Sequence, residues 1–134
     1  MKLRQLIKEY NLEERVFLLG NKDNIINQLK YIDLVLLCSY IEGLPLVPLE
    51  AFSQGVPVIA TNIGGTNEEV VNNLNGYIVK IKDINDFCDK ILKIYKDDKL
   101  YHELRKNSVK VFKEKFNKTL YINKHKNYYS KIQE

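Results

Sequence analysis

Short, nearly continuous apolar runs alternate with segments of helical periodicity along this sequence. Four such runs are expected to form strands, at residues 16–20, 32–39, 57–61 and 76–81. A strand that is apolar along its whole length is buried on both faces, as in parallel sheets covered by helices. The pattern therefore predicts an α/β fold with a doubly wound parallel sheet of about four strands. In such sheets ligands bind outside the carboxyl ends of the strands.

The segments around the runs predict helices. Asp23 is placed to cap one helix, Thr66 or Asn67 a short one, and Asp83 a long one. After Asp83, apolar residues recur at the spacing of one helix face, at Ile84, Phe87, Cys88, Ile91, Leu92 and Tyr95. Further helices are expected at residues 3–10, from Pro48 to Gln54, and at 98–114 and 118–132.

Length and composition narrow the class of protein. At 134 residues the chain holds one domain at most. No apolar run approaches the roughly 18 residues that span a bilayer. The charged N-terminus lacks the apolar core of a signal peptide, so we expect a cytoplasmic protein. Cys38 and Cys88 are too few for a disulfide framework or a zinc site, and we interpret both as buried thiols.

The charge is concentrated at the C-terminal end. Residues 96–131 carry eleven Lys or Arg and four Asp or Glu, whereas the whole chain has a net charge of +4. We interpret these basic helices as a solvated face. Peripheral contact with anionic lipid, on the inner face of the cytoplasmic membrane, is the alternative. We expect no nucleic-acid partner, because the aromatic and basic residues there follow helical core spacing.

Two glutamates, Glu42 and Glu50, lie eight positions apart on either side of a Gly/Pro turn. The turn follows a predicted strand and leads into a helix, whose free N–H groups and positive dipole end favour an anion. Leu44, Leu46 and Val47 are expected to offer N–H groups to a diphosphate. A carboxylate on each side suits the hydroxyl groups of a nucleotide-sugar. The alternative is a solvent-exposed loop residue at 42 and a first-turn glutamate at 50 that interacts with the helix dipole.

The residues around this pair resemble a known family. The run S-x-x-E-G-L-P-L-x-x-L-E-A is followed by G-x-P-V-I-A-T, G-G-x-x-E and N-G-Y-I-V within residues 39–79. Together they resemble the C-terminal, nucleotide-sugar-binding domain of retaining GT-B glycosyltransferases of the family 4 type. The resemblance covers residues from about 2 to 132 and implies the C-terminal half of a GT-B fold.

The resemblance assigns roles around the turn. It implies that Glu42 contacts the sugar ring near the reacting centre, that Glu50 binds the ribose hydroxyls, and that the backbone of residues 43–46 cradles the phosphates. Gly43 fits this role because it permits close backbone approach. Many members have Gly where this chain has Pro45, so one backbone N–H group is lost here.

The resemblance also assigns residues farther from the turn. Asn21 and Lys22 are expected near the nucleobase, mostly through backbone contacts. Gly64 and Gly65 would allow close packing beside the site, unless they form a plain strand-to-helix turn. Ser39, which opens the motif, joins the same sugar-donor-binding set.

The chain lacks parts that the family has. The first two strand–helix units of the domain and the whole N-terminal domain, which binds the acceptor, would precede residue 1. Residues 1–134 would then be a partial domain ending in the basic helices of residues 98–134, with a gap in the sheet between residues 16–20 and 32–39. We expect little turnover from this chain alone, because the phosphate-clamping basic residues and the acceptor half are missing.

The expected function is the sugar-donor-binding part of a retaining glycosyltransferase. It would transfer a sugar from a nucleoside diphosphate to a glycan or lipid-linked acceptor, without a metal or other cofactor. Asp97 and Asp98 are interpreted as a helix start rather than a metal motif. The alternatives are a non-catalytic truncated or split-subunit module that binds nucleotide-sugars, and a GT-B-shaped epimerase, against which the paired glutamates argue.

Overall fold

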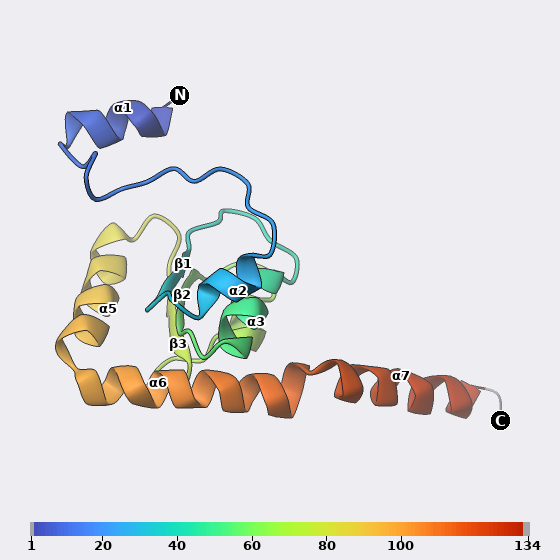
Figure 1. Ribbon diagram of the computed structural model, residues 1–134. Helices are drawn as coiled ribbons and strands as arrows, with labels where there is room; N and C mark the ends of the chain where they lie inside the picture. The colour runs from blue at the N-terminus through green and yellow to red at the C-terminus, as the bar shows by residue number, and fades with distance from the viewer. Residues whose placement is uncertain (1, 133–134) are drawn as a thin grey trace.

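The computed structural model describes residues 2–132, and a three-stranded parallel sheet lies at its centre (Figure 1). The strands are β1 (Val35–Leu37), β2 (Val58–Thr61) and β3 (Gly76–Val79), in the order β1-β2-β3. These are three of the four predicted strands, and the α/β class with its parallel sheet is confirmed. The fourth prediction, a strand at residues 16–20, is wrong for this structure.

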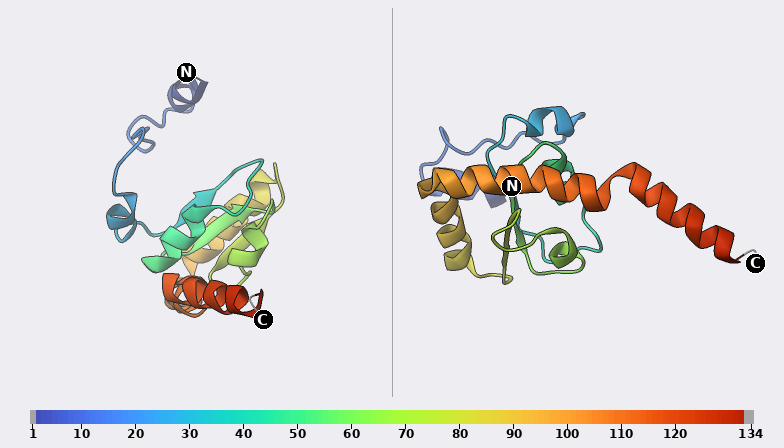
Figure 2. Two further views of the ribbon diagram at one scale, coloured as in Figure 1. Left: turned by 90° about the vertical axis from the view of Figure 1, so that its right-hand side faces the viewer. Right: turned by 90° about the horizontal axis from the view of Figure 1, so that it is seen from below.

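Helices connect and flank the strands. They are α1 (Lys2–Glu9), α2 (Ile25–Leu29), α3 (Leu46–Ser53), α4 (Thr66–Glu69), α5 (Ile84–Lys96), α6 (Asp98–Val111), a π-helical turn η1 (Phe112–Phe116) and α7 (Lys118–Ile132). α7 continues the line of α6 and extends beyond the body of the molecule (Figures 1 and 2). None of the helices in residues 2–132 has the length and apolar character to cross a membrane.

The core lies on both faces of β2, all four of whose residues are buried. Val58 and Ala60 face α3, where Phe52 is fully buried with them. Ile59 points the other way, into a second cluster that includes Ile94 of α5. α6 packs against both α3 and α5 and closes one end of the sheet (Figure 2). The alternation along β2 thus produces the covered sheet that its apolar sequence predicts.

Several local signals behave as the sequence predicts. Gly55 follows α3 with φ +72°, a left-handed conformation that glycine adopts without steric cost. The carboxylate of Asp83 accepts a hydrogen bond from the Asp86 N–H at 3.0 Å and caps α5. Asp97 caps α6 in the same way, through the Leu100 N–H at 2.9 Å. The pair at 97–98 is therefore a helix start.

Two predicted caps are wrong. Asn24, in a left-handed conformation, occupies the N-cap position of α2, where Asp23 was expected, and it makes no side-chain cap hydrogen bond. Thr66 lies inside α4, after Gly65. Its hydroxyl oxygen instead accepts a hydrogen bond from the Ile63 N–H at 3.1 Å, and its single proton lies within reach of the carbonyls of Thr61 and Ile63, at 2.8 and 2.7 Å. The oxygen thus accepts an N–H from before the helix rather than one of the N–H groups of α4.

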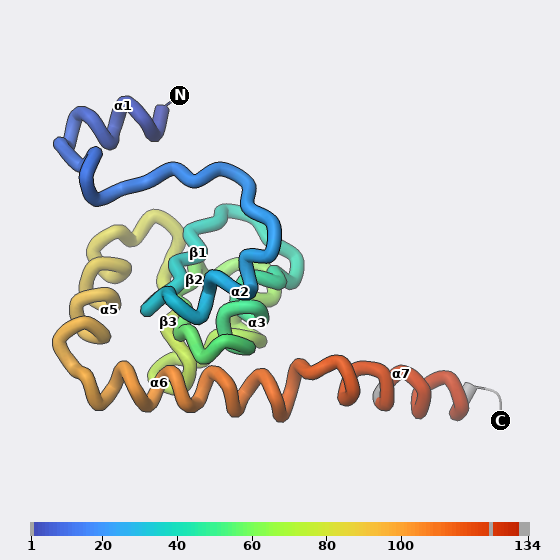
Figure 3. Tube along the Cα trace, viewed as in Figure 1, coloured from blue at the N-terminus to red at the C-terminus, as the bar shows by residue number. Residues whose placement is uncertain are grey.

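The N-terminal arm, residues 2–24, runs outside the sheet as an extended trace that starts with α1 (Figure 3). Phe17 and Leu19 in the predicted strand expose 68% and 65% of their surface. Within residues 2–132, β1 pairs only with β2, so no ladder joins residues 16–20 to β1. A strand needs a hydrogen-bonded neighbour, and the arm has none here. Direct pairing of residues 16–20 with β1 is therefore not seen in residues 2–132, and the absence of two strand–helix units stays a prediction.

Both cysteines differ from prediction. Cys38 and Cys88 are free thiols, and both are exposed. Cys38 lies just after β1 and borders a groove between this strand and α5. Cys38 is exposed because β1 is an edge strand, and Cys88 lies on α5 outside the set of residues, among them Phe87 and Ile91, that pack against the core.

Candidate functional site

Two loops meet at the carboxyl ends of β1 and β2. The Gly65 N–H donates a hydrogen bond to the Gly43 carbonyl at 2.7 Å, which joins the loop after β2 to the loop after β1. The hydroxyl of Thr61, at the end of β2, lies 2.6 Å from the Ser39 carbonyl. The predicted site residues from these two loops are thus brought together at the edge where parallel sheets bind ligands.

Glu42 is held by its own loop. It is half-buried, and its Oε1 accepts a hydrogen bond from the Ser39 hydroxyl at 2.8 Å. Among the described residues, no other side chain hydrogen-bonds or ion-pairs with this carboxylate. One carboxylate oxygen is therefore oriented by the protein, and the other has no side-chain partner among the described residues.

The two glycines after β2 are required by close packing. A Cβ atom on Gly64 would lie 2.1 Å from the Glu42 carbonyl oxygen, and one on Gly65 would lie 2.6 Å from a methyl group of Leu44. Gly64 also has φ +47°, which other residues adopt rarely. The glycine pair is therefore more than a plain strand-to-helix turn, since it lets the second loop press against the backbone of Glu42.

The start of α3 is open to an anion. Pro45 occupies the N-cap position, and no side chain caps this end. The first N–H groups of a helix have no acceptor inside it, and Leu46 and Val47 carry two of them. Their side chains, with that of Leu44, are exposed. Asp83 and Asp97 cap α5 and α6, whereas α3 has no protein carboxylate at its N-cap or in its first turn.

Glu50 lies on the fifth position of α3 and is half-buried. Within residues 2–132 its carboxylate makes no hydrogen bond or ion pair. The dipole interaction of a carboxylate falls off beyond the first helical turn, so this position does not favour the purely structural role. Glu50 and Glu42 thus stand on the helix and on the loop that leads into it.

Asn21 and Lys22 make no hydrogen bond to the two loops at the carboxyl ends of β1 and β2 in the described part of the chain. Both lie exposed on the N-terminal arm. Their placement near a nucleobase stays a prediction.

Two residues of this region were missed by the sequence analysis. Thr61 is 3% exposed and links β2 to the loop of Glu42. A polar residue at the last position of an otherwise apolar strand was the available signal. The other is Glu69, at the end of α4.

Glu69 is fully buried, and neither carboxylate oxygen has a hydrogen-bond partner among the described residues. Burial, with a smaller contribution from the charge of Glu68, raises the pKa of Glu69 from 4.5 to about 7. No pattern in the sequence separates Glu69 from its exposed neighbour Glu68.

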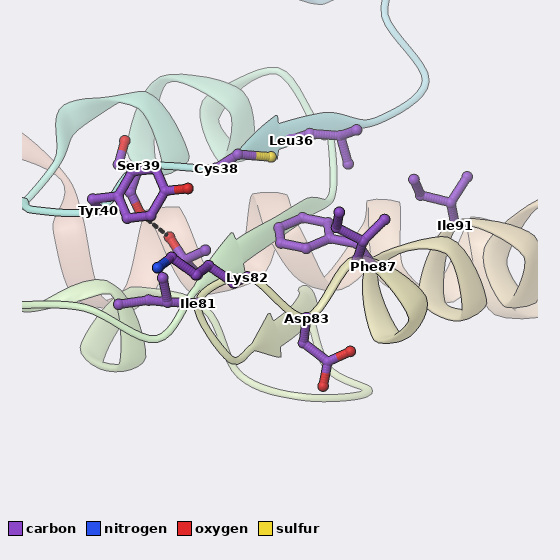
Figure 4. Close-up of a pocket in the computed structure, with 11 residues that line it drawn as sticks. Leu36, Cys38, Ser39, Tyr40, Ile81, Lys82, Asp83, Phe87 and Ile91 are labelled. Carbon is purple, nitrogen blue, oxygen red and sulfur yellow. Dashed lines mark hydrogen bonds between the residues drawn. The ribbon is translucent and has the colours of Figure 1, made fainter.

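An apolar groove lies beside the site, between β1 and α5. We call it the β1–α5 groove; it has a volume of about 270 Å³ and is lined mainly by Leu36, Cys38, Phe87 and Ile91. Figure 4 shows Leu36 of β1 and Cys38 just after it, with Phe87 and Ile91 of α5 across the open space. Ser39 and Tyr40 line its end, whereas neither Glu42 nor Glu50 does. The groove is therefore a neighbour of the two-loop site and not part of it.

The described residues contain no cluster of three or more His, Cys, Asp or Glu side chains that could hold a metal ion. The two loops gather backbone N–H groups, the Glu42 carboxylate and the Ser39 hydroxyl, and the first loop leads into α3, which carries Glu50. Such a set suits a ligand with a negative centre and hydroxyl groups on its flanks.

Comparisons with known proteins agree on one family. A family model described as "Glycosyl transferases group 1" matches residues 1–111. The N-acetyl-alpha-D-glucosaminyl L-malate synthase of Bacillus anthracis is 32% identical over 93% of this chain and 33% of its own length. An Escherichia coli UDP-Gal:alpha-D-GlcNAc-diphosphoundecaprenol alpha-1,3-galactosyltransferase is 39% identical over 74% of this chain and 25% of its own. The chain thus spans a third or less of the length of these relatives.

Solved structures give the same result. Anabaena Alr3699/HepE in complex with UDP is similar with a TM-score of 0.92 and 25% identity, over 97% of this chain and 36% of that one. TarM is similar with a TM-score of 0.82 and 32% identity, over 94% of this chain. The similarity covers nearly all of the chain, so it includes the N-terminal arm as well as the sheet.

Proposed function

Because the chain belongs to the glycosyl transferases group 1 family, we propose that it is the sugar-donor-binding part of a retaining glycosyltransferase of the family 4 type. The observation that carries the proposal is the uncapped start of α3, reached by the loop that holds Glu42 and followed by Glu50. A diphosphate at the helix start would lie between two carboxylates that can accept hydrogen bonds from sugar hydroxyls.

Each group has a proposed role. Glu50 accepts hydrogen bonds from the ribose hydroxyls, as carboxylates do in other nucleotide sites. The N–H groups of Leu44, Leu46 and Val47 bind the diphosphate, with Gly43 allowing its close approach. Glu42, through the oxygen that Ser39 leaves free, contacts the transferred sugar and is the proposed catalytic residue.

In the proposed reaction the bond between the anomeric carbon and the diphosphate oxygen breaks. A bond to the acceptor hydroxyl forms with retention of configuration, and the acceptor loses its proton. The acceptor is a glycan or a lipid-linked sugar, and no metal ion or other cofactor takes part. The UDP complex of Anabaena Alr3699/HepE supports a nucleoside-diphosphate sugar as the substrate.

The rest of the enzyme is also part of the proposal. Two strand–helix units would fill the gap between the N-terminal arm and β1, and a further domain would bind the acceptor. The chain alone would then show little turnover, since the reaction centre would be incomplete. The alternative is a non-catalytic, split-subunit module that binds nucleotide-sugars. The half-buried carboxylates of Glu42 and Glu50 and the open β1 edge are compatible with either form.

We further propose a cytoplasmic location, with contact between the basic helices and anionic lipid as an accessory feature. Co-sedimentation with phosphatidylserine vesicles at low and high salt tests the contact. Equal sedimentation with neutral phosphatidylcholine vesicles would count against it.

The kinetic test uses a chimera in which residues 2–132 replace the matching third of the Bacillus anthracis enzyme. We expect Glu50→Ala to raise KM for the sugar donor by losing charged hydrogen bonds worth about 1.5–3 kcal/mol. Glu42→Ala should lower kcat more than it raises KM, because Glu42 lies near the reacting carbon. Glu68→Ala, at an exposed carboxylate on α4, is the matched control and should change neither.

Equal changes in kcat and KM for both glutamate variants would contradict the division of roles. The anomeric configuration of the product tests retention, and assays with and without a chelator test the absence of a metal. A chimera that binds the sugar donor but transfers nothing would favour the non-catalytic alternative.

A further inference from the structure

Ser39 uses its only hydroxyl proton inside the protein. The hydroxyl donates to Glu42 Oε1 at 2.8 Å, and both residues are half-buried. A serine hydroxyl has one proton to donate. While Ser39 donates this hydrogen bond to Glu42, it has no proton to donate to a phosphate or a sugar. Direct binding of the sugar donor is therefore not its main role.

The backbone of Ser39 is fixed from the other side by Thr61. The Thr61 hydroxyl lies 2.6 Å from the Ser39 carbonyl and 3.3 Å from that of Leu37, and the shorter contact is the stronger hydrogen bond. Thr61 is the last residue of the fully buried strand β2. Ser39 is therefore attached to the central, fully buried strand of the sheet.

The backbone of Glu42 is confined as well. Gly64 packs against its carbonyl, and the Gly65 N–H holds the next carbonyl, that of Gly43. A glutamate side chain has several rotatable bonds, and fixing them on ligand binding costs conformational entropy. The Ser39 hydrogen bond fixes the carboxylate before any ligand arrives.

We propose that Ser39 is a positioning residue, through which Thr61 and β2 aim the free oxygen of Glu42 at the sugar ring. The inference rests on the proposed function, in which Glu42 faces the transferred sugar. It differs from the role of a phosphate or sugar ligand for Ser39. It also predicts that Ser39 affects only the part of a nucleotide-sugar that Glu42 touches.

The test compares two probes, UDP and UDP-glucose, by calorimetric titration of the 134-residue protein. We expect Ser39→Ala to weaken UDP-glucose about tenfold, the effect of losing one hydrogen bond to a charged group, and to leave UDP unchanged. Ser39→Thr keeps the hydroxyl and should restore binding of UDP-glucose. Thr61→Val should reproduce the selective loss, and a melting curve for each variant shows whether it folds.

Glu42→Gln and the double variant Ser39→Ala/Glu42→Gln complete the design. If Ser39 acts through Glu42, the double variant binds UDP-glucose no more weakly than Glu42→Gln alone. A full additional loss in the double variant, or an equal loss of UDP and UDP-glucose in Ser39→Ala, would overturn the inference.

The same data separate this inference from the proposed function. If neither probe binds the unsubstituted protein, the proposed function fails and the inference fails with it. If Glu42→Gln leaves UDP-glucose binding intact, the inference alone fails, since the proposed function assigns Glu42 mainly to kcat. If Glu42→Gln weakens UDP-glucose selectively while Ser39→Ala changes nothing, the proposed function stands and the role of Ser39 is wrong.

Discussion

The two edge strands of the sheet, β1 and β3, differ in how far their polar groups are hydrogen-bonded and their side chains are buried. On β3, the Asn72 side-chain oxygen accepts a hydrogen bond from the Ile78 N–H at 2.8 Å, and Tyr77 is buried with its hydroxyl bonded to Asn73. On β1, the side chain of Leu36 is 46% exposed and borders the β1–α5 groove. Both strands come from similar apolar runs, so strand propensity does not explain the difference.

The comparison shows that the segments beside an edge strand, and not the strand's own sequence, decide whether its edge is covered. The turn before β3 supplies the polar groups that an edge needs, whereas β1 is approached by an arm that pairs with nothing in residues 2–132. An unpaired, apolar edge invites another strand. The stability of the protein should therefore depend on tight packing at the closed β3 side. The open β1 edge should govern self-association.

The largest effect is expected at the closed side of the sheet, from Gly76→Ala. A Cβ atom there would lie 1.8 Å from the Val58 carbonyl oxygen. Both atoms belong to paired strands, so the backbone must move and the ladder must open. We expect a loss of about 3 kcal/mol or more in the free energy of unfolding, measured by urea denaturation.

Gly43→Ala is the matched control for that experiment. A Cβ atom on Gly43 meets nothing within 4 Å, so its stability should stay close to that of the unsubstituted protein. Similar losses for both variants would show that the β2–β3 contact is less constrained than its geometry indicates.

The next largest effect on stability is expected at Glu69, the buried and unpaired carboxyl group at the end of α4. Its pKa is raised from 4.5 to about 7, so the folded protein favours the neutral form. The neutral carboxyl group contributes roughly 3 kcal/mol to the free energy of unfolding. This stabilisation is fully present below pH 4.5 and is lost as the pH rises through 7. Glu69→Gln stays neutral, so we expect it to lack this loss and to be the more stable protein at pH 8.

Urea denaturation between pH 4 and pH 8 measures the difference. Glu68→Gln removes only the smaller cause of the shift and should retain most of the pH dependence. Parallel stability curves for Glu69→Gln and the unsubstituted protein would show that Glu69 is not buried without a partner.

The sequence predicts β1, β2 and β3 because their apolar runs are recognisable without knowledge of their neighbours. It also predicts the caps at Asp83 and Asp97, where one side chain bonds the backbone three residues later. The run at 16–20 has the same apolar character but is not a strand here. Pairing depends on a second segment, and local composition carries no information on whether that segment is present.

The candidate site likewise contains some features that the sequence predicts and others that only the folded structure shows. Glu42 and Glu50 are predicted from spacing and the glycine pair from the family resemblance, and the two loops that carry Glu42 and the glycines do meet. The Ser39 hydrogen bond that fixes Glu42 is local, three residues apart, whereas the Thr61 hydrogen bond that fixes Ser39 spans 22 residues and comes from tertiary packing. Burial of Glu69 rather than Glu68 is equally a result of packing, and the sequence gives no sign of it.

The smallest effect is expected at the open edge, and it is an effect on association. We predict that the unsubstituted protein self-associates with rising concentration, because β1 and the β1–α5 groove offer an apolar, unpaired edge. Leu36→Lys puts a charge on that edge and should weaken association about tenfold. Val71→Lys, on an exposed apolar residue near β3, is the matched control and should change little. Sedimentation velocity at several concentrations measures both.

Asn72→Ala provides the converse test of the two edges. It removes the side chain that satisfies the Ile78 N–H, so β3 should become a second open edge and association should strengthen. If Leu36→Lys and Val71→Lys weaken association equally, the contact does not run through β1. If the unsubstituted protein stays monomeric at all concentrations and unfolds cooperatively, an open β1 edge is tolerated. The account of a missing neighbouring strand would then be wrong, because the three-stranded sheet would be sufficient by itself.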